Sequence, residues 1–323
     1  MLRFFVFLCA IFLLSPAAAS AQSARPRSGE QVADSIEIAR LARSLTRAAT
    51  NDSARAARLY EWVARNLSYD VQGYLQGRLA DGTPENVFRK RVAVCGGYAA
   101  LFERMAREVG LEAKPILGYA KGFTYRPGAS SKQPNHAWLA VRLSGQWRLV
   151  DPTWGSGFVR SNKFEPQFSW DYFLVEPNEL ILSHYPEDNE WQLLAKPIRR
   201  GEFERLPMIP RVLVNAGFDP SVIRASALKH GVRSFPLVGT RSDVRIIAAP
   251  LNGTLPRKSK VSVDVSWPDG AEVALVSGGV WRKLTRDGDR FRGEAIASAS
   301  ALHLVGRSGG SKEFETLLQY QVQ

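Results

Sequence analysis

A helix signal, a hairpin signal and three chemically reactive side chains fall within residues 91–154, and this stretch constrains the fold more than any other. Cys95 opens a run in which Leu101, Phe102 and Met105 recur at three- and four-residue steps, the period of an amphipathic helix. At a helix N-terminus, unpaired backbone N–H groups and the positive end of the helix dipole favour a thiolate over a thiol. The sequence therefore predicts a reactive sulfur on the first turn of a helix.

A β-hairpin is predicted farther along the same stretch. His136 begins an apolar run that ends at a Ser144-Gly145 turn signal, and a second run returns through Val150 to Asp151. A two-residue turn would place His136 and Asp151 diagonally on one face, about 7 to 8 Å apart across the two strands and within reach through their side chains. A turn one residue longer would put them on opposite faces, so their pairing depends on the short turn or a compensating bulge.

Three motifs of this stretch resemble a known family. Cys-Gly-Gly-Tyr from Cys95, Asn-His-Ala-Trp around His136 and Asp-Pro-Thr-Trp from Asp151 resemble, in this order, the transglutaminase-like superfamily of papain-related folds. The run 184–194 resembles the branch that contains the kyphoscoliosis-type peptidases. The resemblance covers roughly residues 50 to 200. It implies a nucleophile Cys95, a base His136 and an orienting carboxylate Asp151.

Further residues are expected to border a substrate cleft: Tyr69, Gln72, Gly96, Trp138 and Trp154. Gly96 would leave the approach to the sulfur free of a side chain, and Tyr69 or Gln72 would be candidates for the side-chain half of an oxyanion hole.

His184 is a second histidine near the predicted site. Because no carboxylate follows it on a returning strand, we predict a packing role for it rather than that of a rival base. The four histidines and Cys95 share no ligand spacing, so the sequence predicts neither a metal site nor a cofactor.

The chain of 323 residues exceeds the usual size of one domain. From residue 242 onward, short alternating runs recur between turn signals such as Asn252-Gly253, a pattern typical of an antiparallel sandwich. We predict an α+β fold with these parts: a leader and N-terminal helix (22–50), a transglutaminase/papain-like catalytic domain (51–205), a connector (206–240) and an all-β, immunoglobulin-like sandwich (241–323).

Local patterns add detail to this prediction. A helix is expected over about 31–48, with Val32, Ile36, Ala39 and Leu45 facing inward, and a second helix capped at Asn51. Downstream of the hairpin, residues 158–170 have no regular period, and residues 171–175 have the composition of a strand.

Residues 1–21 have the features of a secretory signal peptide. Arg3 precedes an apolar run, and small residues follow up to Ala21, after which we predict cleavage. The run is shorter than the roughly 20 residues of a membrane span, and an uncleaved anchor is the minor alternative. Cleavage would remove Arg3 and Cys9, leaving a single cysteine, a net charge of +11 in place of +12, and a secreted or periplasmic protein without an internal disulfide.

These features predict an exported Cys-His-Asp enzyme that cleaves or transfers peptide or amide acyl groups through a thioester on Cys95. Water as acceptor would make it a peptidase or amidase, and an amine would make it a transglutaminase; the kyphoscoliosis-type resemblance favours hydrolysis. A peptidoglycan stem-peptide endopeptidase and a non-catalytic peptide-binding scaffold on the same fold are the alternatives. We expect a protein or peptide partner, the cell envelope being one source, with neither nucleic-acid binding nor stable membrane insertion after cleavage.

Overall fold

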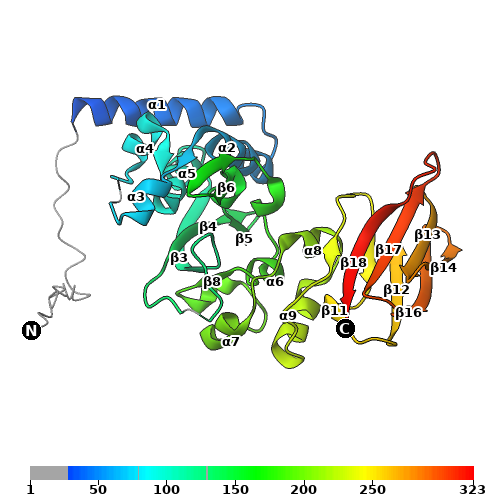
Figure 1. Ribbon diagram of the computed structural model, residues 1–323. Coiled ribbons are helices and arrows are strands. Elements are labelled where there is room, and N and C mark those ends of the chain that lie inside the picture. The colour runs from blue at the N-terminus through cyan, green and yellow to red at the C-terminus, as the bar shows by residue number, and fades with distance from the viewer. Residues whose placement is uncertain (1–27, 79, 129) are drawn as a thin grey trace, which may run out of the picture.

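Residues 28–78, 80–128 and 130–323 are described by the structure, a computed structural model of the chain. Helices packed on a four-stranded sheet fill one end of the molecule, a sandwich of two sheets fills the other, and short helices lie between them (Figure 1). The predicted signal peptide and its cleavage site lie outside the described residues. Within the described residues, no helix has the length and hydropathy needed to span a bilayer.

The first half of the chain alternates helices with short strands. Its elements up to the hairpin are α1 (Gly29–Thr46), α2 (Asp52–Asn66), β1 (Ser68–Tyr69), α3 (Val71–Leu75), α4 (Pro84–Lys90), β2 (Val92–Ala93), α5 (Cys95–Glu108), β3 (Glu112–Ala120), β4 (His136–Leu143) and β5 (Gln146–Val150). They are followed by β6 (Gly157–Arg160), β7 (Lys163–Pro166), α6 (Pro177–Leu180), β8 (His184–Pro186) and α7 (Arg200–Arg205).

The two N-terminal helices begin where polar side chains can cap them. The Ser28 hydroxyl accepts the Gln31 backbone N–H in a capping box, and Asn51 Oδ1 accepts the N–H of Ala54, as its sequence position predicted. The predicted inward face of α1 is right only in part: Leu45 packs partly buried against the core, but the N-terminal half of the face does not. Val32 and Ile36 are exposed, because the helix turns the alternative stripe around Ile38 and Ala42 toward the core.

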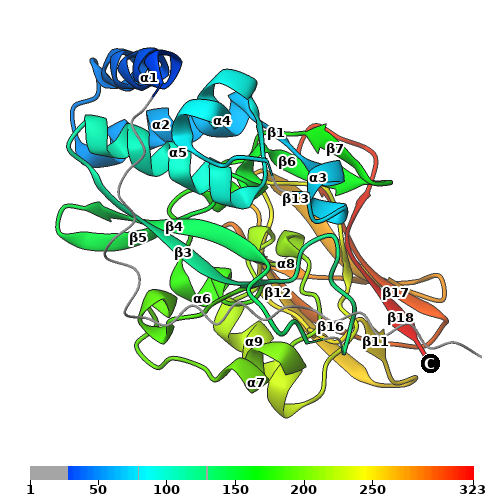
Figure 2. The ribbon, with the colours of Figure 1, turned by 90° about the vertical axis from the view of Figure 1, so that its left-hand side faces the viewer.

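A four-stranded antiparallel sheet in the order β5-β4-β3-β8 organises this half. Helix α5 packs on β3 and β4. Helices α1, α2, α4 and α5 lie on one side of the sheet, and α6, α7 and α9 (Pro220–Lys229) lie on the other (Figure 2). The helical side buries the larger core, which includes Tyr98, Phe102 and Leu139. A smaller cluster around Trp138 covers the opposite face.

The β4–β5 hairpin has the shorter of the two turns that the sequence left open. Leu143 pairs with Gln146 and Leu139 with Val150, which makes Ser144-Gly145 a two-residue turn. Both turn residues have positive φ, 48° and 81°, as type I′ turns require.

Downstream of the hairpin the sequence-based expectations were wrong twice. Residues 158–170 are not irregular: strands β6 and β7 form a small hairpin over 157–166, around a turn at Ser161-Asn162 whose residues also have positive φ. Residues 171–175 are not a strand: a 3-10 turn spans Trp170–Tyr172, and only Val175 makes an isolated bridge, to Leu149.

The last third of the chain is a sandwich of two sheets around a common core. Val263 and Phe291 from one sheet meet Leu275 and Leu304 from the other. The predicted α+β class with an all-β second half is confirmed, while the immunoglobulin-like assignment and the domain boundaries stay predictions. The sheets comprise β9 (Leu237–Val238), β11 (Thr254–Leu255), β13 (Gly270–Ser277), β14 (Val280–Lys283), β17 (Ala301–Ser308) and β18 (Glu315–Val322) on one side, and β10 (Arg245–Ala248), β12 (Lys260–Ser266), β15 (Thr285–Asp287) and β16 (Arg290–Ile296) on the other.

The predicted connector is an ordered pair of helices, α8 (Arg211–Asn215) and α9. Leu213 and Ile223 are fully buried in the core of the sandwich. Ala227, one turn beyond Ile223, is buried against Tyr185 and Phe203 of the first half. The connector therefore packs on both halves of the molecule.

Candidate active site

Cys95 is the first residue of helix α5, as the sequence predicted. The preceding strand β2 pairs in parallel with β1, which fixes the entry of the chain into the helix. A side chain at Gly97 would meet the Cβ atom of Ala93 at 2.7 Å, whereas one at Gly96 would meet nothing within 4 Å. Gly97 is thus required for packing, and Gly96 leaves open space beside the sulfur.

His136 and Asp151 meet at the open end of the β4–β5 hairpin. The His136 ring bonds through Nε2 to Asp151 Oδ2 at 2.8 Å, and both side chains are almost fully buried. The other oxygen, Oδ1, accepts the backbone N–H groups of Thr153 and Trp154 at 2.9 and 3.1 Å. Because Nε2 faces the carboxylate, Nδ1 is the ring nitrogen available to the sulfur of Cys95.

The three groups are electrostatically coupled. Burial alone would raise the pKa of the Cys95 thiol, but a hydrogen bond with His136, the charge of that ring and a hydrogen bond from the Ala137 backbone leave the pKa below its ordinary value. Burial alone would lower the pKa of His136, yet the charge and hydrogen bond of Asp151, together with the sulfur, raise it well above the usual range. The site therefore favours a thiolate beside an imidazolium.

His184 reaches the same carboxylate from the other side, which the sequence did not predict. Its Nε2 lies 3.1 Å from Asp151 Oδ2, and its Nδ1 lies 2.8 Å from the Ser183 hydroxyl. Burial, opposed by the bond to Asp151 and reinforced by the charge of His136, lowers the pKa of His184 to about 4. His184 is therefore neutral at pH 7 and donates its Nε2–H to Asp151, a hydrogen-bonding role that the predicted packing role did not include.

Asp151 thus receives four hydrogen bonds, two on each oxygen. Burial would raise the pKa of this carboxyl, but the charge and hydrogen bond of His136 and the bond from His184 hold it well below its usual range. One carboxylate balances one positive charge, so the two imidazoles differ: His136 is the charged one and His184 the neutral one.

The residues His136, Asp151 and His184 are also of the types that bind metals, and their ligand atoms lie within 4.8 Å of one another. The sequence spacing gave no sign of this proximity. Binding an ion would require both imidazoles to release the Nε2 protons that they now share with Asp151, and would occupy His136. The observed geometry is that of a hydrogen-bonded cluster.

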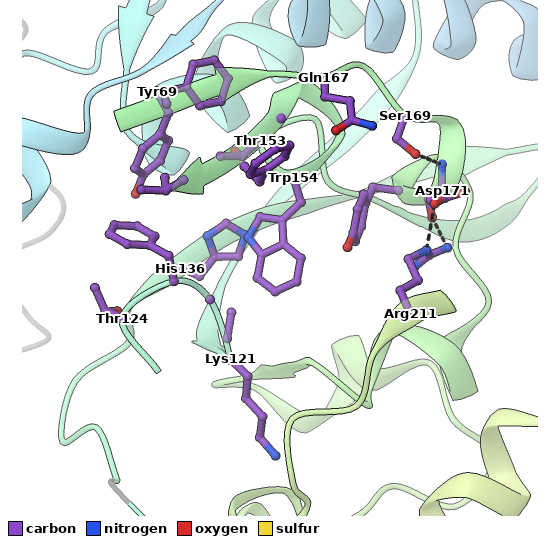
Figure 3. Close-up of a pocket in the computed structure, with 18 of the residues that line it drawn as sticks. Tyr69, Lys121, Thr124, His136, Thr153, Trp154, Gln167, Ser169, Asp171 and Arg211 are labelled. Atoms are coloured by element: carbon purple, nitrogen blue, oxygen red, sulfur yellow. Dashed lines mark hydrogen bonds and ion pairs between the residues drawn. The ribbon is translucent and has the colours of Figure 1, made fainter. Parts of the chain in front are cut away.

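A cavity of about 560 Å³ opens beside His136 (Figure 3). Of the five residues expected to border a cleft, Tyr69 and Trp154 line it. The other three do not. The Gln72 amide donates to the Asn162 carbonyl, Gly96 faces open space, and Trp138 is 1% exposed and stacks at 6.0 Å from the His136 ring.

Sequence reasoning missed most of the remaining lining. The opposite walls come from the loop after β3, from the β6–β7 hairpin and from the connector, with Phe123, Phe164 and Met208 among their residues. No motif marks these positions, because three segments far apart in sequence must fold together before they face one cavity. Of the three predicted catalytic residues only His136 lines the cavity, and Cys95 is 8% exposed.

Comparison with known proteins agrees with this geometry. Residues 39–152 match the transglutaminase-like superfamily. The chain is 37% identical over 180 residues to kyphoscoliosis peptidase of Mus musculus and 31% identical over 192 residues to hillarin of Drosophila melanogaster. The matches cover 55% of this chain in both cases, but only 27% and 23% of those proteins.

The chain therefore spans about a quarter of the length of these curated relatives. A crystal structure of a TGase matches with 22% identity and a TM-score of 0.34, over 48% of this chain and 40% of that one. Residues 39–152 therefore carry a transglutaminase-like domain, and the sequence is similar to the kyphoscoliosis-type branch of that superfamily.

Proposed function

We propose that the protein is a cysteine peptidase or amidase that cleaves a peptide or amide substrate through a thioester on Cys95. One observation carries the proposal: His136 is held by Asp151 through one nitrogen and coupled to the thiol through the other, so that the thiol pKa falls despite burial. A buried cysteine without a catalytic partner would have a raised pKa.

The reaction divides into two steps. The Cys95 thiolate attacks the carbonyl carbon, the Cys95 backbone N–H helps to hold the oxyanion, and the His136 imidazolium gives its proton to the departing amine. The thioester that remains is attacked by water, whose proton returns to His136 while the acid is released. Asp151 stays ionised throughout, fixes the ring and stabilises its charged form.

The acceptor decides between hydrolysis and transfer, because the three residues serve both reactions. Two of the relatives are named peptidases, which supports hydrolysis. Transfer to a primary amine, the transglutaminase reaction, is the competing outcome.

Two further alternatives come from the sequence. A stem-peptide endopeptidase of the cell wall would act by the same chemistry on a peptidoglycan substrate. A non-catalytic peptide-binding scaffold would fit the low exposure of Cys95, which is 8%.

Export is part of the proposal. The signal-peptide features of residues 1–21 support secretion or delivery to the periplasm, and cell-envelope proteins or peptides would then be the accessible substrates. N-terminal sequencing of the mature protein tests this: a chain that begins after Ala21 is expected, and an intact Met1 would contradict export by this route.

The deciding experiment traps the intermediate. The purified full chain is incubated with peptides from a lysate or from cell wall, quenched in acid, and its intact mass and Cys95-containing tryptic peptide are measured. We expect an acyl adduct on Cys95 that is absent from the Cys95→Ala variant. Adding a primary amine then separates the outcomes, because hydrolysis gives free acids and transfer gives amides. Absence of both adduct and product with every peptide pool would leave the scaffold alternative.

A further inference from the structure

The cavity beside His136 is lined mainly by apolar and aromatic side chains. They include Phe123, Trp154, Phe158 and Phe164. Its volume of about 560 Å³ falls within the range of roughly 300 to 1,000 Å³ typical of ligand sites, which are usually apolar with a few polar groups.

The charged side chains at the far end are already paired. Arg211 lies 3.5 Å from the Asp171 carboxylate (Figure 3). It also lies 2.5 Å from the Glu179 carboxylate, and its guanidinium stacks 4.6 Å from the centre of the Tyr172 ring. Lys121 also lines the cavity, but its amine is bonded to the backbone carbonyls of Phe203 and Leu206. These contacts leave little uncompensated charge for a ligand. The cavity therefore has the character of an apolar pocket rather than an ion site.

One wall of the cavity belongs to the connector. Met208 and Val212 line it, and both remain largely exposed, at 49% and 43%. The buried Lys121 amine holds the chain immediately before them by donating to the carbonyls of Phe203 at 2.9 Å and Leu206 at 2.5 Å. A wall with a fixed position and unburied apolar side chains is suited to a partner that buries them.

One polar group lies near the catalytic end. Thr153 is 5% exposed and lines the cavity beside His136, and within the described part of the chain its hydroxyl has no hydrogen-bond partner. A buried hydroxyl without a partner is costly. The peptide group of a bound substrate would supply the missing bond.

From these observations we infer that the cavity binds a large apolar side chain, aromatic or branched aliphatic, of the peptide whose carbonyl is presented to Cys95, and that Met208 and Val212 determine this specificity. The inference rests on the proposed function, since the occupant is a substrate residue. The position of the cavity supports this occupant, because His136 both lines the cavity and is hydrogen-bonded to the Cys95 thiol, so the side chains next to a carbonyl held at the sulfur are the substrate groups nearest to it. A charged side chain would lose its hydration against these walls without gaining a counter-ion.

A proteome-derived peptide library first identifies a bond that the protein cleaves. The test then compares two peptides containing that bond, which differ only in having phenylalanine or aspartate at the residue next to it. We expect the wild-type chain to have a higher kcat/KM for the phenylalanine peptide than for the aspartate peptide. Val212→Asp should lower kcat/KM for the phenylalanine peptide by about tenfold or more, chiefly by raising KM, because it removes apolar contacts in the pocket. Met208→Asp should act in the same direction. Val222→Asp is the matched control: Val222 is 53% exposed on the same connector and does not line the cavity.

Two further measurements separate failure of the pocket from failure of the proposed function. Alkylation of Cys95 by iodoacetamide in the Val212→Asp chain reports whether the thiol is intact, and a rate within about twofold of wild type is expected. Binding of N-acetyl-phenylalaninamide and N-acetyl-aspartamide to the Cys95→Ala chain needs no turnover. Preferred binding of the aromatic amide without cleavage of any peptide would refute the catalytic proposal and retain the pocket. Cleavage that ignores the phenylalanine-to-aspartate change, or equal binding of the two amides, would overturn the pocket.

Discussion

Replacing Asp151 by asparagine tests the central arrangement with a change of one atom. Asp151 accepts two backbone N–H groups on Oδ1 and two imidazole N–H groups on Oδ2. An amide has only one oxygen. If it faced the imidazoles, the amide NH₂ would oppose the N–H groups of Thr153 and Trp154, and two buried donors would lose their acceptor at about 1 to 3 kcal/mol each.

The amide oxygen therefore stays with the backbone, and its NH₂ faces the two rings. His136 must then accept at Nε2 and carry its proton on Nδ1, the nitrogen that should take the proton from Cys95. Together with the loss of the negative charge, this removes the base and raises the pKa of the thiol. In a Ser-His-Asp triad the same change lowers kcat by about 10⁴, and we expect a loss of about 10³ to 10⁴ in acylation here.

The assay needs no knowledge of the substrate. The rate of Cys95 alkylation by iodoacetamide is measured from pH 5 to pH 10, because it follows the thiolate fraction. Wild type should react appreciably at neutral pH, and the Asp151→Asn profile should shift to higher pH with a native circular dichroism spectrum. Asp171→Asn, which removes a carboxylate that contacts Arg211 and Asn215, is the control. Superimposable profiles for wild type and Asp151→Asn would refute the reasoning.

The remaining predictions concern stability. The pKa of His184 is about 4 in the folded protein, below the ordinary 6.5, so the unfolded chain binds a proton at higher pH than the folded one does. The free energy of unfolding should therefore fall as the pH is lowered from 6.5 to 4, by at most about 3 kcal/mol from this group. In urea titrations, the free energy of unfolding of His184→Phe should depend less on pH over this range than that of the wild type. An equal pH dependence in the two proteins would contradict the prediction. Gly97→Ala should lower the midpoint of thermal unfolding, because a Cβ at this position would lie within 3 Å of Ala93 and Val87, at a cost of about 1 to 3 kcal/mol in unfolding free energy. Gly96→Ala is the control, because a Cβ there meets open space and should leave the midpoint unchanged. Equal midpoints for the two variants would contradict the packing described. Leu213→Ala, fully buried in the core of the sandwich, should cost about 2 to 5 kcal/mol in denaturant titration, against little change for the exposed Val222→Ala.

Much of the candidate site follows from local sequence. The helical period after Cys95 predicted the helix, and the Ser144-Gly145 signal predicted the hairpin. The proximity of His136 to Asp151 followed for a two-residue turn, which is the turn the structure has. These features depend on short-range geometry, so periodicity and turn chemistry determine them.

The rest depends on contacts between distant segments. His184 reaches Asp151 only because β8 pairs with β3 on the side away from β4, and sheet order cannot be deduced from a three-residue strand. The Ser161-Asn162 turn lacks the glycine that marks most type I′ hairpins, so β6 and β7 were not expected. On α1, two apolar stripes compete, and tertiary packing selects the one around Ile38.

Because the connector packs on both halves of the molecule, the chain cannot be cut into two fragments that each keep a complete core. A truncation that ends before α9 uncovers Tyr185 and Phe203, whereas one that retains α8 and α9 without the sandwich leaves Leu213, Phe218 and Ile223 facing water. Neither cut yields a fragment with a closed surface. The two halves should accordingly melt in one calorimetric transition, and attempts to express the cysteine-bearing half by itself should give aggregates.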